Sequence, residues 1–183
     1  MSGETPTAPE IVDFWRQAGP KRWFEKDAAF DEEIRSRFLT AHERAAAGEF
    51  DGWAATAEGA LALLLLLDQF PRNMFRGSSR AFESDEKARS VTAAALLKGY
   101  DAQVEPELRS FFYLPFEHSE DMADQERGIA LYTAAGDEDG LKWAKLHADI
   151  IRRFGRFPHR NACLGRVTKP EEQKFLDDGG FAG

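Results

Sequence analysis

Apolar residues recur every three or four positions through most of this chain, a spacing typical of helices with one buried face. The clearest stripe lies between Asp27, a residue type that caps helices, and Gly48, a residue type that ends them. Its members are Phe30, Ile34, Phe38, Ala41 and Ala45. This pattern predicts an amphipathic helix over the whole range.

The most apolar segment runs from about Ala54 to Phe70 and contains an unbroken leucine-rich stretch at 61–67. Leucine and alanine favour helix, and a helix that is apolar on every side belongs in a protein core. The stretch is far shorter than the roughly 20 residues that span a bilayer. We therefore expect the central buried helix here and no association with a membrane.

The remaining helices are predicted from caps and stops. We expect Met1–Pro9 to be a mobile tail, followed by a short helix from near Glu10 to Gly19–Pro20. Five further helices are expected at Asp85–Lys98 capped by Ser84, at Glu105–Tyr113, from Ser119 to Ala135, from Asp137 to Phe154, and from a Thr168–Glu171 capping box to Asp177. No stretch alternates as a strand does. The fold class predicted is all-α, a single domain over 10–183 built as an antiparallel array of about seven to eight helices.

Composition narrows the classes of function. The chain has 183 residues, enough for a full core, and a net charge of -8 with a pI near 5.1. An acidic protein of this kind does not offer the cationic face that nucleic acid requires, so no nucleic-acid partner is predicted. Cys163 is the one cysteine and no leader pattern opens the sequence, which makes the cytoplasm the expected location.

One segment reverses the local charge. Residues 152–166 hold five arginines and a histidine but no acid, and Gly155 and Pro158 predict a loop there. A shorter segment at 70–77 repeats the order Phe-Pro, Arg-Asn and a glycine beside an arginine. If these two predicted loops converge, they form an anion-binding corner. Its candidate ligand-binding residues are Arg72, Asn73, Arg76, Arg156, Arg160 and Asn161.

Three predicted helices place a polar residue in an apolar stripe: Asp68, Gln125 and His147. A buried polar group costs about 1–3 kcal/mol unless it is paired, so each needs a partner. They are either structural ties or the lining of a polar pocket completed by the turn Glu117-His118-Ser119. Ser119 is correspondingly either a helix cap or a contact for an anion at a helix N-terminus.

Catalytic interpretations use the same residues. His118 or His159 could act as acid and base, with Glu117 orienting it and the arginines holding a carboxylate or phosphate, which suggests hydrolysis. Cys163 beside His159 is a weaker nucleophile–base pair. The histidines lack the helical spacing of common zinc sites, so no metal is predicted. No nucleotide-binding motif is present, and no cofactor is expected.

Three longer motifs carry a resemblance to a known family. They are Asp68–Asn73 with Arg76-Gly77, Pro115–Glu120, and Arg153–Asn161 with Leu164–Arg166. In this order they resemble the bacterial domain-of-unknown-function 924 family over about Ile11–Leu176. The resemblance implies an all-helical fold related to tetratricopeptide-repeat proteins and no established activity. The chain departs from the family after Arg166, where Val167-Thr168-Lys169 replaces an acid and Ser-Thr, and it has no clear repeat of roughly 34 residues.

Three hypotheses of function follow. The first is a binding module whose polar pocket holds a small anionic ligand or an acidic peptide. The second is a hydrolase-type enzyme that uses the same pocket. The third is a protein-interaction scaffold in which the motifs only fix loops. The oligomeric state stays open.

Overall fold

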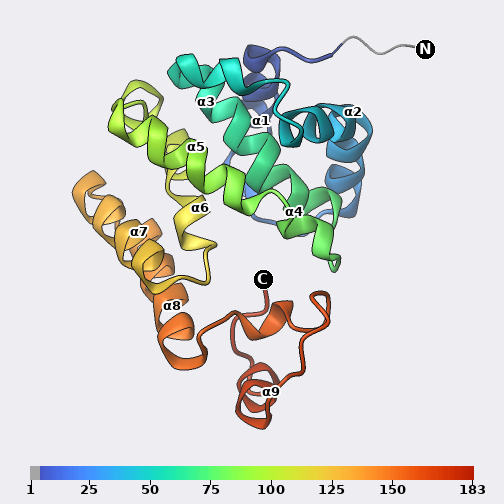
Figure 1. Ribbon diagram of the computed structural model, residues 1–183, viewed down its shortest axis with the longest axis vertical. Helices are drawn as coiled ribbons and strands as arrows, with labels where there is room; N and C mark the ends of the chain where they lie inside the picture. The colour runs from blue at the N-terminus through green and yellow to red at the C-terminus, as the bar shows by residue number, and fades with distance from the viewer. Residues whose placement is uncertain (1–4) are drawn as a thin grey trace. The chain divides into compact units, whose positions relative to one another are not determined.

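The computed structural model describes residues 5–183, and every regular element in this range is helical (Figure 1). The all-α fold class is therefore confirmed. The chain forms two compact units. The first contains the chain up to Arg76 together with Arg80–Pro115, and the second contains Gly77–Ser79 together with Phe116–Gly183.

The first unit contains α1 (Ala8–Trp23), α2 (Ala28–Ala46), α3 (Ala57–Leu64), α4 (Phe70–Met74) and α5 (Asp85–Leu97). Short 3-10 helices η1 (Asp51–Ala55) and η5 (Pro106–Phe112) occupy the connections, and η5 replaces the predicted α-helix at Glu105–Tyr113. Helix α3 packs on α1 and on α5, as Figure 1 shows. The leucine-rich segment is thus central to this unit, as predicted.

Helix α2 forms where the apolar stripe predicts it. The carboxylate of Asp27 accepts the N–H groups of Ala29 and Phe30 at 2.9 and 3.1 Å, which satisfies two amides that the helix cannot bond internally. All five residues of the stripe are buried. The cap and the stripe together explain why this segment is helical.

Helix α1 differs from its prediction. It begins at Ala8, because Glu10 accepts the N–H of Thr7 at 2.7 Å and so stabilises an earlier start. It also continues past Gly19, which has a φ of 75° and kinks the helix before Trp23. Ala8 and Pro9, which were predicted to belong to the tail at 1–9, are therefore helical. Residues 1–4 of that predicted tail lie outside the described range.

The predicted loop at 70–77 is wrong in its first half, because Phe70–Met74 is helical. A π-helical turn, η2 (Leu65–Gln69), joins α3 to α4 and makes one continuous helical run. Pro71 has no N–H for the carbonyl of Leu67 four residues earlier. Ser84 Oγ donates to that carbonyl at 2.5 Å instead, and His42 Nδ1 donates to the carbonyl of Leu66 at 2.8 Å. Side chains from α2 and from the start of α5 thus replace the missing backbone bonds.

The core of the first unit is aromatic around Trp15. Its ring lies 5.4 Å from Phe70, 5.6 Å from Phe111, 5.9 Å from Phe30 and 6.0 Å from Trp23, measured between centroids. Such offset and edge-on pairs stabilise a core beyond the area that they bury. Trp15 therefore links α1 to α2, α4 and η5.

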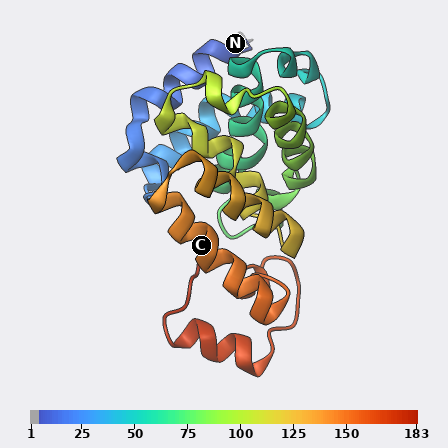
Figure 2. The same cartoon turned by 90° about the vertical axis from the view of Figure 1, so that its left-hand side faces the viewer.

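The second unit contains α7 (Met122–Ala135), α8 (Glu138–Phe154) and α9 (Pro170–Asp177), with α6 (Leu114–Glu117) at the point where the chain enters it. Helices α7 and α8 lie side by side as a hairpin in Figures 1 and 2. Gly136 ends α7 with a φ of 70°, and Asp137 accepts the N–H of Gly140 at 2.9 Å to begin α8, both as predicted.

Helix α9 begins one residue later than the predicted capping box. Glu172, not Glu171, reaches back to the backbone, and it accepts the N–H of Lys169 at 2.7 Å. Pro170 is the first helical residue, a position where its missing N–H costs nothing. The cap position therefore belongs to Lys169 and not to Thr168. Within residues 5–183, no helix has the length and apolar character that crossing a membrane demands.

Candidate functional site

The first Arg-Asn segment is attached to α2. Asn73 Nδ2 donates to Asp31 Oδ1 at 2.8 Å, and Arg76 Nη2 donates to the same oxygen at 3.0 Å. Arg76 Nε donates to the other carboxylate oxygen. Asp31 lies in the first turn of α2, where the helix dipole favours a negative charge. The segment therefore binds a carboxylate of its own unit.

Arg72 makes a second ion-pair cluster. Its two terminal nitrogens each lie 2.9 Å from an oxygen of Asp85 in the first turn of α5, and Nη1 also lies 3.1 Å from Asp68. Burial alone would lower the pKa of Arg72, but the charges of Asp68 and Asp85 outweigh it and raise the pKa. Asp68 is thus the counter-ion of an arginine, one of its two predicted roles.

The second Arg-Asn segment is attached to α9. Arg156 donates to Glu172 through Nε at 2.6 Å and Nη2 at 2.8 Å, and Asn161 Nδ2 donates to Glu172 at 3.1 Å. The bonds from Arg156, with those from the Lys169 amide and Asn161, lower the pKa of Glu172 to about 2 against the effect of burial. Glu172 is buried and stays ionised at neutral pH.

The two segments therefore use one design. In each, an arginine and an asparagine share one carboxylate, and that carboxylate lies in the first turn of another helix. A charge-assisted pair of this kind holds a fixed geometry. The repeated asparagine takes part in both of these clamps, but the arginine differs, because Arg76 follows Asn73 whereas Arg156 precedes the repeated pattern.

Arg166 extends the second clamp toward the turn before α7. It pairs with Glu120 through two bonds of 2.7 and 3.0 Å, and its Nε donates to Asn161 Oδ1 at 2.9 Å. Burial raises the pKa of Glu120, but the bonds from Arg166 and from the Phe157 amide lower it below its usual value. The buried Arg160 lies over the ring of Phe157 at 4.4 Å.

The turn at Glu117-His118-Ser119 is held by Gln125. Its Nε2 lies 2.7 Å from the carbonyls of both Glu117 and Ser119, so Gln125 is the helix-to-loop tie that one interpretation predicts. The N-cap of α7 is Asp121, whose carboxylate accepts the Ala123 N–H at 2.7 Å, and the predicted Ser119 cap is wrong. Ser119 Oγ instead donates to Asp124 at 2.7 Å.

Glu117 and His147 form a buried pair. Glu117 Oε1 lies 2.7 Å from His147 Nδ1, and both side chains are more than nine-tenths buried. The sequence suggests Glu117 as a partner of His118 or His159, but the turn aims it at α8. His118 is half-buried in that turn, and the ring of His159 lies 5.2 Å from that of Phe181.

The thiol of Cys163 contacts the backbone of its own segment. Its Sγ donates to the carbonyl of Arg160 at 3.2 Å, an ordinary structural contact. Across the described residues, no group of three or more acidic, histidine or cysteine side chains could hold a metal ion.

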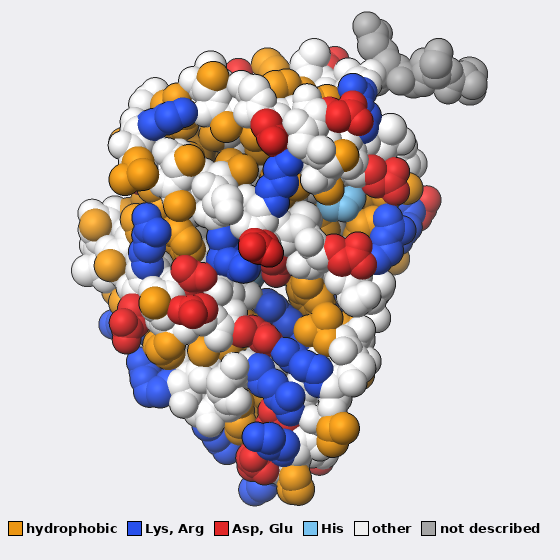
Figure 3. Space-filling view, in the orientation of Figure 1, with side chains coloured by type: hydrophobic (Ala, Val, Ile, Leu, Met, Phe, Trp, Pro, Cys, Tyr) orange, Lys and Arg blue, Asp and Glu red, His pale blue; other side chains and the backbone are white. Residues whose placement is uncertain are grey.

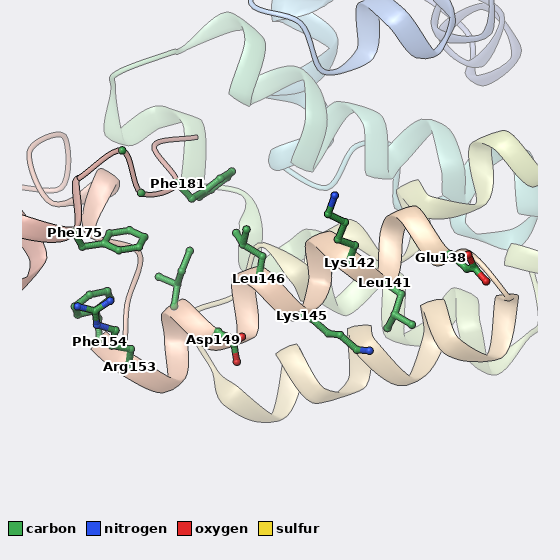
Figure 4. A pocket seen from close by; sticks show the side chains of 13 residues that line it. Glu138, Leu141, Lys142, Lys145, Leu146, Asp149, Arg153, Phe154, Phe175 and Phe181 are labelled. Carbon is green, nitrogen blue, oxygen red and sulfur yellow. The ribbon is translucent and has the colours of Figure 1, made fainter. Parts of the chain in front are cut away.

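A groove of about 880 Å³ runs along the exposed face of α8 (Figure 4). Its walls are apolar, with charged side chains among them. The apolar residues are Leu141, Leu146, Ile150, Phe154, Phe175 and Phe181, and the charged ones are Glu138, Lys142, Lys145, Asp149 and Arg153. Phe175 and Phe181 come from α9 and the segment after it, so three parts of the second unit build the groove.

The groove escaped the sequence prediction because α8 is apolar on two faces. The face with Ala144, His147 and Ile151 is buried, whereas Leu141 and Phe154, at the same helical spacing, are only partly buried and line the groove. Leu146 and Trp143 lie outside that stripe, with 38% and 51% of their surface exposed. Two large apolar residues on the solvent side of one helix were the feature of the sequence that could have indicated the groove.

Comparison with known proteins assigns the chain to a family. The model of a family described as bacterial protein of unknown function (DUF924) matches residues 11–180. The chain belongs to the DUF924 family. A solved structure of a protein of unknown function from Agrobacterium tumefaciens is 51% identical to this chain, with a TM-score of 0.91, and the match covers 94% of this chain and 97% of that one. A search of curated proteins finds no match.

In this DUF924 chain, the predicted site residues divide between the units. Asp68, Arg72, Asn73 and Arg76 lie in the first, and the others lie in the second. In the second unit the structure brings together Glu117 with His147, and Arg156 with Asn161. A ligand-binding role for any of these residues stays a prediction.

Proposed function

We propose that this protein is a binding module that holds an acidic, amphipathic segment of another protein in the groove along α8. One observation carries the proposal: α8 packs one face on α7 and leaves a second apolar face open as the groove floor. Amphipathic helices bind other proteins by laying an apolar face into such a groove. A groove of about 880 Å³ is large enough for several side chains.

The charges beside the groove favour an acidic occupant. Three cations, Lys142, Lys145 and Arg153, line it. The two acids of the lining are Glu138 and Asp149, and the carboxylate of Asp149 is already paired with Arg152 outside the groove. In a protein with a net charge of -8, this local basic character is a departure from the average. In Figure 3, basic side chains (blue) lie beside acidic ones (red) in the lower part of the view, where Figure 1 shows α9. Complementary charges at a rim select partners and speed association.

The small-anion hypothesis has less support than the acidic-peptide hypothesis. Arg72, Arg76 and Arg156 already pair with carboxylates of their own unit, so an added anion would have to displace Asp85, Asp31 or Glu172. Breaking a well-paired, partly buried ion pair is costly. The relation to tetratricopeptide-repeat proteins stays a prediction.

The proposal can be tested without knowing the partner, by selecting binders from a displayed library of random 16-residue peptides. We expect the selection to enrich sequences with apolar residues at helical spacing and an excess of Asp and Glu. A synthetic peptide from this pool is then titrated by fluorescence anisotropy. The double change Lys142→Glu and Lys145→Glu should weaken the binding of this peptide at least tenfold.

Two matched controls isolate the groove. Lys26→Glu introduces the same kind of charge change at an exposed position of the first unit and should leave affinity within twofold. Leu146→Ser should weaken binding, whereas Leu97→Ser, at a leucine that is 86% exposed, should not. Enrichment of basic peptides, or equal losses from groove and control changes, would refute the proposal.

A further inference from the structure

His147 has one ring nitrogen whose hydrogen-bonding capacity is unused. Nδ1 lies 2.7 Å from a Glu117 carboxylate oxygen. In a neutral imidazole whose proton is on Nδ1 and faces this carboxylate, Nε2 is a hydrogen-bond acceptor. Among the described residues, Nε2 is buried and has no hydrogen-bond partner. A buried acceptor without a donor is costly to keep, so it suggests a ligand group.

Aromatic rings pack against the imidazole of His147. The centroid of Phe181 lies 4.6 Å from that of His147 and 5.2 Å from that of His159, both edge-to-face. Phe157 lies 5.5 Å from His147 on a buried cluster with Ile150 and Ile151. The space over the imidazole therefore accommodates a six-membered ring, and at present Phe181 supplies it.

The ring of Phe181 anchors the segment that carries it, through contacts with Trp143, His147 and His159. The N–H of Gly180 bonds the carbonyl of Phe175 at 2.9 Å, and in the described range the backbone hydrogen bonds of the segment end there. A Cβ on Gly180 would lie 2.5 Å from Phe175, so glycine is required where the chain turns off α9. Beyond this turn, removing the ring of Phe181 from its site requires no backbone hydrogen bond to break.

We infer that this position is a binding site for an aromatic ring that carries a hydroxyl group, such as a phenol, and that Phe181 occupies it in the absence of ligand. A phenyl ring satisfies the packing but leaves Nε2 without a donor. A phenol satisfies both, because its O–H can donate to Nε2 while its ring keeps the edge-to-face contacts. Glu117 is the positioning residue that holds the imidazole at Nδ1 and leaves Nε2 for the ligand. The site shares Phe181 with the proposed peptide groove, but His147, the residue that would bind the hydroxyl group, does not line that groove.

The test compares two probes of almost equal size, p-cresol and toluene. In Phe181→Ala the ring site is empty, and NMR titration should show p-cresol binding about tenfold more tightly than toluene, the value of one good hydrogen bond. In the wild type p-cresol should bind more weakly than in Phe181→Ala, because Phe181 competes. Adding His147→Phe to Phe181→Ala should abolish the preference, since the ring remains and the acceptor does not.

Equal affinities for both probes in a folded Phe181→Ala protein would overturn the inference. So would a preference for p-cresol that survives His147→Phe, or no binding of either probe. If Phe181→Ala does not fold, Phe181→Leu removes the ring but keeps apolar volume and permits the same comparison. The changes Lys142→Glu and Lys145→Glu should not affect p-cresol, which separates this result from that of the peptide groove.

Discussion

At the residue scale, the arginine-rich segments are explained by carboxylates that lie far away in the sequence. Asp31 precedes Asn73 by 42 residues, and Glu172 follows Arg156 by 16. The sequence shows that cations gather, because that is a local property. It does not show which acid meets each one, because that depends on how helices pack. For the same reason, the sequence left two roles open for Asp68 and Gln125, a structural tie or the lining of a pocket.

Glu172 supports a prediction about acid stability. Its pKa is about 2 in the folded protein and near 4.5 when unfolded. A lowered folded-state pKa contributes stability above pH 4.5, and this contribution is lost as the pH falls toward 2. We expect Glu172→Gln to lower the free energy of unfolding at pH 7 by about 2–3 kcal/mol, because charged hydrogen bonds to a buried acceptor are lost.

Urea denaturation at a series of pH values measures this contribution. The difference between wild type and Glu172→Gln should shrink as the pH falls from 4.5 to 2. Glu171→Gln, at the exposed neighbour, serves as the control and should change stability by less than about 0.5 kcal/mol. A wild-type-to-variant difference that does not change with pH would show that Glu172 is not held ionised.

At the element scale, the helices that follow a regular stripe were predictable and the irregular ones were not. The apolar spacing of α2 and the glycine stops of α7 and α8 depend only on neighbouring residues. The π-helical turn at Leu65–Gln69 depends on Pro71 and also on donors from α2 and from the start of α5. Local sequence marks Pro71 as a helix breaker, but it does not show that Ser84 and His42 compensate.

Ser84 tests this explanation of the π-helical turn. Ser84→Ala should leave the buried carbonyl of Leu67 without its donor and cost about 1–3 kcal/mol of unfolding free energy. The matched control is Ser90→Ala on α5, where the exposed hydroxyl donates to the carbonyl of Glu86, a residue of the same helix. Thermal denaturation should therefore show a clear loss for Ser84→Ala and almost none for Ser90→Ala. Equal losses would contradict the role of Ser84.

At the scale of the whole molecule, the all-α class followed from sequence, but the groove did not. Apolar stripes at helical spacing, together with caps, indicate how many helices form and roughly where they lie. A binding surface depends on which apolar residues stay uncovered after packing, and Leu146 on α8 and Phe181 beyond α9 are 35 positions apart. The clusters that sequence reasoning favoured for a ligand are instead occupied by the protein's own carboxylates.

Hydrogen–deuterium exchange with a selected acidic peptide is the most direct test of the central claim that the groove along α8 is the binding surface. We predict slower exchange on binding in α8 from Leu141 to Phe154 and at Phe175–Phe181. The segments at 70–77 and 156–166 should exchange as they do in the free protein. Protection confined to those two arginine-rich segments, with α8 unchanged, would contradict the claim and favour the anion-binding hypothesis.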